Sequence, residues 1–128
     1  MSSSETATQS RAQGDSGYVT AEAALALPVL MLFGLALVWA LMAASAQIQC
    51  VDAARVGARA AARQEPRAAT EAAVRQAAPD GAKVGFRREG DLVRVLVEAP
   101  APGPGRLGLA LRAEAVALAE ETVGAGAT

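Results

Sequence analysis

The sequence predicts an α+β fold, in which one long N-terminal helix precedes a small domain of helix and strands. Residues 23–46 form an unbroken apolar run whose only polar side chain is that of Ser45. Further along, an alanine-rich segment has helical spacing, and two segments alternate apolar with polar residues as half-buried strands do. We expect a disordered leader at 1–17, a long helix over 18–64 and a small soluble domain over 65–128.

The apolar run is long enough to span a membrane. As a helix rising about 1.5 Å per residue, residues 23–46 extend roughly 36 Å, and a hydrocarbon layer is about 30 Å thick. We therefore expect one transmembrane segment here, in contact with membrane lipid. Residues 1–16 before it are polar and lack any apolar periodicity, which predicts disorder.

Beyond the apolar run the helix pattern continues with small residues and arginines. Ala54, Gly57 and Ala58 leave room for a neighbouring helix to approach closely. Arg55 and Arg59 are four residues apart on another face, which is typical of a solvated helix surface. We expect these five positions to form the packing segment of the helix.

The rest of the chain predicts four shorter elements. Residues 107–121 are ambiguous, because their alternation suits a strand while their alanine, leucine and glutamate content suits a helix. We favour the strand, since a lone hairpin needs a further element for stability. The predicted elements are a helix over 66–78, strands over 82–88 and 91–98 joined by a turn at Glu89-Gly90, and a strand over 107–121.

Composition argues against several classes of function. The 128 residues contain no histidine and one cysteine, Cys50, so we find no nucleophile–base arrangement, no metal-ligand cluster and no cofactor motif. The net charge of −1 gives no basic field for nucleic acid. We expect neither an enzyme nor a protein that binds a small-molecule substrate.

One carboxylate, Glu22, immediately precedes the apolar run. Taken alone, it could equally be a helix-start acid favoured by the helix dipole. Its setting, Gly17, four residues, Glu22 and then an apolar helix, resembles the signal of type IV prepilins. The resemblance implies that a prepilin peptidase cuts after Gly17. Cleavage would create an ammonium at Tyr18, one helical turn from Glu22.

A second resemblance covers roughly residues 15–64. The stretch AEAALALPVLMLFGLALVWALMAAS, followed by AARVGAR at residues 53–59, is similar to TadE-type proteins, the pilin-like minor components of tight-adherence pili. Major pilins of such systems are very short and carry a Glu-Tyr pair, whereas this chain has Glu22-Ala23 and an additional soluble part. The resemblance therefore implies a minor pilin or pseudopilin, whose partners are other pilin-like subunits and the assembly machinery.

Orientation is predicted differently by two signals. Arg11 is the only basic residue before the apolar run, while several arginines follow it, so charge counting places the C-terminal part in the cytoplasm. The prepilin resemblance instead implies a single-pass protein of the cell membrane with a cytoplasmic N-terminus and an extracytoplasmic C-terminal domain. We adopt the second orientation. The alternative function is an uncleaved single-pass anchor that carries a small extracytoplasmic binding domain.

Overall fold

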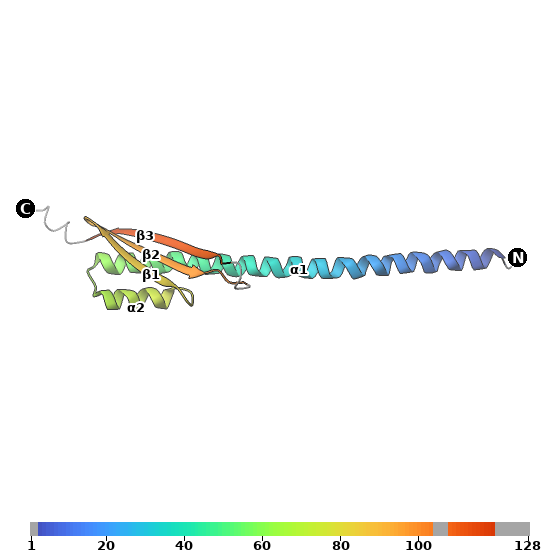
Figure 1. Ribbon diagram of the computed structural model, residues 1–128, viewed down its shortest axis with the longest axis horizontal. Helices are drawn as coiled ribbons and strands as arrows, with labels where there is room; N and C mark the ends of the chain where they lie inside the picture. Colours follow the sequence, from blue (N-terminus) through green and yellow to red (C-terminus); the bar gives the residue numbers. More distant parts are fainter. Residues whose placement is uncertain (1–2, 104–107, 120–128) are drawn as a thin grey trace, which may run out of the picture. The chain divides into compact units, whose positions relative to one another are not determined.

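The computed structural model describes residues 3–103 and 108–119, with side chains from residue 14 onward. It confirms the α+β fold (Figure 1). The chain divides into two compact units, residues 1–38 and 39–128. The elements are α1 (Ser3–Ala62), α2 (Arg67–Ala77), β1 (Lys83–Glu89), β2 (Leu92–Pro100) and β3 (Ala110–Leu118).

Helix α1 begins at Ser3, so the prediction of disorder over residues 1–16 is wrong from that residue on. The segment contains good helix formers, alanine, glutamine and Arg11 among them. An existing helix can also extend into such a segment at one hydrogen bond per residue, without a new nucleation step. The polar composition indicated a segment without a core, but it did not exclude a helix joined to the apolar run.

The C-terminal end of α1 is closed by a Schellman motif, two residues earlier than predicted. The amide of Glu65 donates to the carbonyl of Ala60, and the amide of Gln64 donates to that of Ala61. Gln64 has a φ of 58°, the left-handed conformation that this motif requires. Pro66 then precedes α2, and its fixed φ suits a helix start.

The three strands form one antiparallel sheet in the order β1-β2-β3. Glu89 pairs with Leu92, so the hairpin turn is Gly90-Asp91, one residue later than predicted. Gly90 has a φ of 60°, which a glycine adopts at the first central position of a tight turn without steric cost. β3 confirms the strand expected in the region 107–121, of which residues 107, 120 and 121 lie outside the described residues.

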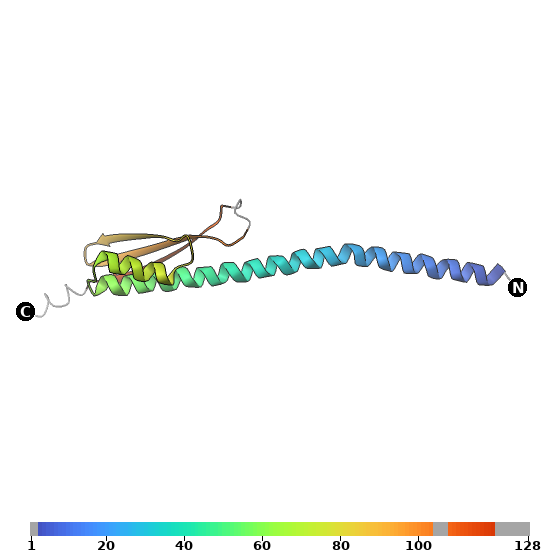
Figure 2. The same cartoon turned by 90° about the horizontal axis from the view of Figure 1, so that it is seen from below.

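The C-terminal part of α1 and helix α2 both cover the same face of the sheet (Figure 2). The core between these layers contains residues of α1, α2 and the sheet. Among the strands, β2 contributes the most core residues. The core therefore includes part of α1, whereas the predicted domain boundary at residue 65 left that helix outside. Its buried members are Cys50, Ala53, Ala54, Ala58, Val74, Val95, Val97, Ala99 and Ala113.

Gly57 sets how closely α1 approaches the other layers. A Cβ placed on Gly57 would lie 2.6 Å from Cγ2 of Val74 and 2.9 Å from Cγ1 of Val95. Both neighbours are fully buried valines, whose branched side chains have few alternative rotamers. The missing side chain thus lets one helix turn contact α2 and the centre of β2 together.

We predict that Gly57→Ala destabilises the folded domain. The added methyl overlaps two stiff side chains in a close-packed core, and such overpacking costs about 1–3 kcal/mol, which exceeds the gain of about 1 kcal/mol from replacing glycine in a helix. Thermal unfolding of the full chain in detergent, followed by circular dichroism, should show a lower midpoint.

Gly85→Ala is the matched control in the same unit. A Cβ on Gly85 would meet only Cβ of Leu96, at the ordinary contact distance of 3.9 Å. Its midpoint should stay unchanged or rise slightly, because glycine weakens a strand. Equal midpoints for the two variants would contradict the assigned role of Gly57.

Candidate functional site

The three residues of the predicted processing site lie on α1, within the unit formed by residues 1–38. Tyr18 is 81% exposed, and Gly17 and Glu22 are also exposed. Tyr18 and Glu22 are four residues apart and so one helical turn apart on the same face. The arrangement allows a new amine at Tyr18 and the Glu22 carboxylate to neutralise each other.

The helix around the Gly17–Tyr18 bond contains several weak points. No atom lies within 4 Å of a Cβ built at Gly14 or at Gly17, so packing does not require glycine at either position. Each glycine costs an interior helix position about 1 kcal/mol relative to alanine. Thr20 Oγ1 also donates to the carbonyl of Ser16 at 2.9 Å, a side-chain bond that competes with helical pairing. Local unwinding of the helix is therefore comparatively easy here.

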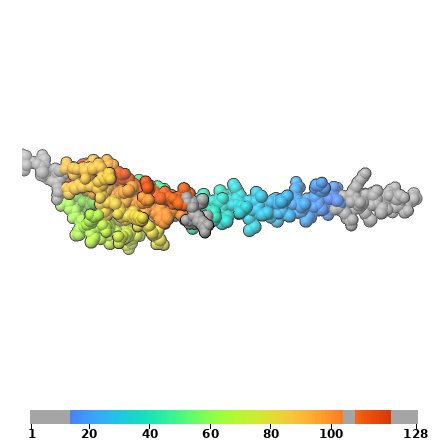
Figure 3. Space-filling model, viewed as in Figure 1, coloured from blue at the N-terminus to red at the C-terminus, as the bar shows by residue number. Residues whose placement is uncertain are grey.

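The helix that follows is exposed along the face that Figure 3 shows. Every described side chain from residue 14 to residue 38 is exposed, including Leu25, Met31 and Phe33. This helix is long and apolar enough to cross a membrane. An apolar surface of this extent normally marks contact with lipid or with other helices.

The predicted packing segment divides into two groups. Ala54, Gly57 and Ala58 are buried against the other layers of the same chain, while Arg55 and Arg59 are exposed. The small residues thus allow the close approach that the sequence predicted, but to the chain's own helix and sheet. This group belongs to the unit formed by residues 39–128, whereas Gly17, Tyr18 and Glu22 belong to the unit formed by residues 1–38.

Comparison with known families matches residues 17–59 to the TadE-like proteins. Among curated proteins, the apoptosis inhibitor Rv3655c of Mycobacterium tuberculosis is 42% identical over 96 residues, which cover 75% of this chain and 76% of the relative. The chain belongs to the TadE-like family. No solved structure matches it. The matched segment begins at Gly17 and includes Glu22 and the packing segment, so this TadE-like protein carries the predicted residues inside the family region.

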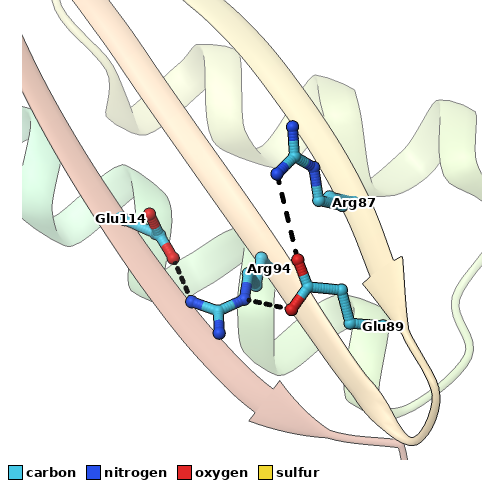
Figure 4. A network of polar contacts seen from close by, with 4 residues as sticks. All are labelled: Arg87, Glu89, Arg94 and Glu114. Atoms are coloured by element: carbon cyan, nitrogen blue, oxygen red, sulfur yellow. Dashed lines mark hydrogen bonds and ion pairs between the residues drawn. The ribbon is translucent and has the colours of Figure 1, made fainter.

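A group of charged residues on the outer face of the sheet was not predicted (Figure 4). Arg94 Nη1 donates to Glu114 Oε1 at 2.6 Å, and Arg94 Nε donates to Glu89 Oε2 at 3.1 Å. The hydrogen bond to Glu114, followed by that to Glu89, raises the pKa of the Arg94 guanidinium. Arg87 Nη1 lies 3.9 Å from Glu89 Oε1 and forms a further ion pair. Strand alternation places all four on one face, but only the strand register shows that they meet.

A cavity of about 450 Å³ opens between α2, β1 and the end of α1. Thr70 lines it, yet the hydroxyl of Thr70 is buried without a hydrogen-bond partner and has almost no accessible surface. That hydroxyl is therefore unavailable to a ligand in the cavity. In the described part of the chain, no three His, Cys, Asp or Glu residues lie close enough to hold a metal ion.

Cys50 is fully buried in the core between α1 and the sheet. Desolvation raises its pKa above the ordinary 9.0. A thiol in this position behaves as a small apolar group, because the thiolate is the reactive form and burial disfavours it.

We predict that Cys50 resists alkylation in the folded protein. Iodoacetamide at pH 8 should react at least about tenfold faster after denaturation, since labelling requires opening of the core. A raised pKa in the folded state contributes stability that is present below pH 9 and is lost as the pH rises through the folded-state pKa. Cys50→Ala should remove this part of the alkaline destabilisation, and rapid labelling of the native protein would contradict the assignment.

Proposed function

We propose that this TadE-like protein is a minor pilin or pseudopilin, a structural subunit that takes part in assembling a tight-adherence pilus or a related secretion filament. A prepilin peptidase would remove residues 1–17, and the mature chain would begin at Tyr18. The single observation that carries the proposal is a Glu22 carboxylate one helical turn from Tyr18, at the start of an exposed apolar helix within the family region.

The exposed apolar helix is compatible with two successive environments, the lipid bilayer and a bundle of helices in a filament. Before assembly, lipid would cover its leucine, methionine and phenylalanine side chains, which are exposed in the single chain. After assembly, helices of neighbouring subunits would replace the lipid. A helix that is apolar all round suits both environments, because neither requires a polar face.

The proposed orientation places the N-terminus in the cytoplasm and the folded domain outside the cell membrane. The proposal gives the protein no enzymatic role. The rival proposal is an uncleaved anchor that holds the same domain at the membrane. The arginines that follow the apolar helix count against the proposed orientation by the positive-inside rule, and the orientation is adopted here because a prepilin requires it.

We predict that the mature protein begins at Tyr18 in cells with an active prepilin peptidase. N-terminal sequencing or intact mass of the protein from purified membranes measures this directly. Gly17→Ala should leave most of the protein unprocessed, because a side chain next to the scissile bond changes the fit in the peptidase. An N-terminus at Met1 or Ser2 in the wild type would instead support the uncleaved anchor.

We predict that Glu22→Gln keeps membrane insertion and cleavage but loses filament association. In a pilin, the amide cannot offset the ammonium at Tyr18 or a charge on an incoming subunit, and one charge is left unpaired among apolar helices. We expect the fraction that co-purifies with pilus components to fall by about tenfold or more, given the cost of such unpaired charges. The measurement compares membrane amount, processing and pilus association in one strain.

Asp52→Asn is the matched control, because it also changes an exposed acid of α1 to its amide, but beyond the apolar segment. It should leave all three quantities unchanged. In an uncleaved anchor, Glu22→Gln would be nearly silent, since it only removes a charge from the edge of the membrane. Equal pilus association of wild type and Glu22→Gln at equal membrane amount would overturn the proposal.

A further inference from the structure

Among the described residues, β1 and β3 are the two edge strands of the sheet. At β3, hydrogen bonds show which backbone groups face β2: the amide of Ala119 donates to the carbonyl of Asp91, and the amide of Ala101 donates to that of Leu109. Odd-numbered residues of β3 therefore bond to β2. The even-numbered residues Arg112, Glu114, Val116 and Leu118 present their amides and carbonyls at the free edge.

Very little covers this edge within residues 3–103 and 108–119. Gln47 Nε2 donates to the carbonyl of Arg112 at 3.0 Å. The described residues provide no partner for the edge backbone groups of Glu114 and Val116. Val116 is also 47% exposed and Leu118 is 62% exposed. A long edge with exposed apolar side chains is a template for another strand.

The edge of β1 differs in side-chain size and charge. Its odd-numbered residues bond to β2, so Val84 and Phe86 present backbone groups outward. Their side chains lie on the inner face of the sheet and are large, whereas the inner positions of β3 are mostly alanine, as at Ala113 and Ala115. On the outer face, β1 carries the basic residues Lys83 and Arg87. The two edges thus complement each other in side-chain size.

The membrane helix restricts how two copies can pair. If β3 paired with β3 of a second copy around a two-fold axis, the α1 segments beneath the two sheets would run in opposite directions. The two chains would then leave the paired sheets toward their apolar runs at opposite ends. β1 and β3 of one chain run parallel, because each is antiparallel to β2. Pairing β3 with β1 of a neighbour in the same orientation keeps all the helices parallel.

We propose that the β3 edge binds the β1 edge of a second copy of this chain, which continues the sheet from subunit to subunit. The contact is heterologous, so each copy offers one edge to each of two neighbours and the series remains open. The inference rests on the proposed membrane-anchored subunit for the common direction of the helices, and it names the contact between the folded domains.

Charge selects the register. Two registers keep all of β1 opposite β3 with the inner faces matched. One places Arg87 opposite Glu114 and Phe86 opposite Ala113, while the other places Lys83 opposite Arg112. Like charges directly opposite each other destabilise a strand pair, and opposite charges stabilise it. The proposed contact therefore pairs Arg87 of one copy with Glu114 of the next.

Cysteine crosslinking of the full chain in membranes tests this register. In a Cys50→Ala background, Arg87→Cys and Glu114→Cys are combined in one chain. Within one copy these positions are separated by two strand spacings, about 9.5 Å, and by a further two residues along the strands, which exceeds the roughly 7 Å Cα limit for a disulfide. Oxidation should give a ladder of dimers, trimers and larger species, at least about fivefold more than either single variant, because only neighbouring copies bring the two positions within that limit.

Mixtures of the two single variants should give dimers alone. The pair Lys83→Cys with Arg112→Cys, which belongs to the other register, should stay monomeric. Any one of three results would overturn the proposal. The first pair could give no species larger than a monomer, Glu114→Cys without its partner variant could give dimers, or the second pair could give a ladder. The membranes used for crosslinking contain no other pilus protein. Absence of the ladder would therefore count against the edge contact, whereas a failure of processing or of the Glu22→Gln experiment would count against the proposed pilin function.

A second pair of variants tests the backbone contact. Val116→Pro removes an edge amide while leaving the bonds from β3 to β2 in place, and proline is tolerated at such edge positions. It should abolish the crosslinked ladder with an unchanged unfolding midpoint, whereas Val116→Thr, which keeps the amide, should retain the ladder. An undiminished ladder with Val116→Pro would show that the edge backbone is not the contact.

Discussion

The folded domain depends on the close approach of α1 to α2 and β2 at Gly57. At this point the hydrogen of a glycine faces Val74 on one element and Val95 on another, and neither valine can move far in a close-packed core. The alanines at 53, 54 and 58 continue the same face. A larger residue at Gly57 would separate the layers and expose the valines of β2. The absence of a side chain at this one position therefore sets the spacing between α1 and the other layers.

The same helix meets two different surroundings along its length, and its composition follows them. Where side chains are exposed, between residues 14 and 38, the apolar residues are mostly large, such as Leu32 and Phe33. From Cys50 onward the buried residues are small, because a sheet and a second helix must approach the helix axis. Large side chains bury the most apolar surface against lipid or neighbouring helices. Small side chains instead let the backbone of the helix approach the sheet closely.

The outer face of the sheet carries several ion pairs, beside the exposed apolar side chains of Leu96, Val116 and Leu118. The ion pairs formed by Arg94 with Glu89 and Glu114, and by Arg112 with Glu98, join strands across the exposed surface. Burying these charged groups against another sheet would cost free energy, because they would lose contact with water. In the proposed association of copies, the contact is therefore made by the backbone groups along the edges.

Sequence alone determined those features that repeat with a fixed period or need a particular residue. The apolar run, the helix stop before Pro66, the alternation of the strands and the Gly17–Glu22 spacing are all local, and local patterns are read directly from neighbouring residues. Local alternation did not by itself decide the strand at 110–118, because its composition also suited a helix; the strand was favoured since a lone hairpin needs a further element for stability.

Tertiary structure decided what depends on residues far apart in the chain. The partner of the small-residue face could have been another helix in a membrane, and only the folded chain shows that it is Val74 and Val95. The meeting of Arg94 with Glu89 and Glu114 required the strand register. The polar leader became helical because α1 extends into it, which its own composition does not reveal. These outcomes depend on side-chain packing and on cooperative extension of a helix. In both cases the stabilising free energy comes from neighbouring parts of the chain, so the composition of one segment does not reveal it.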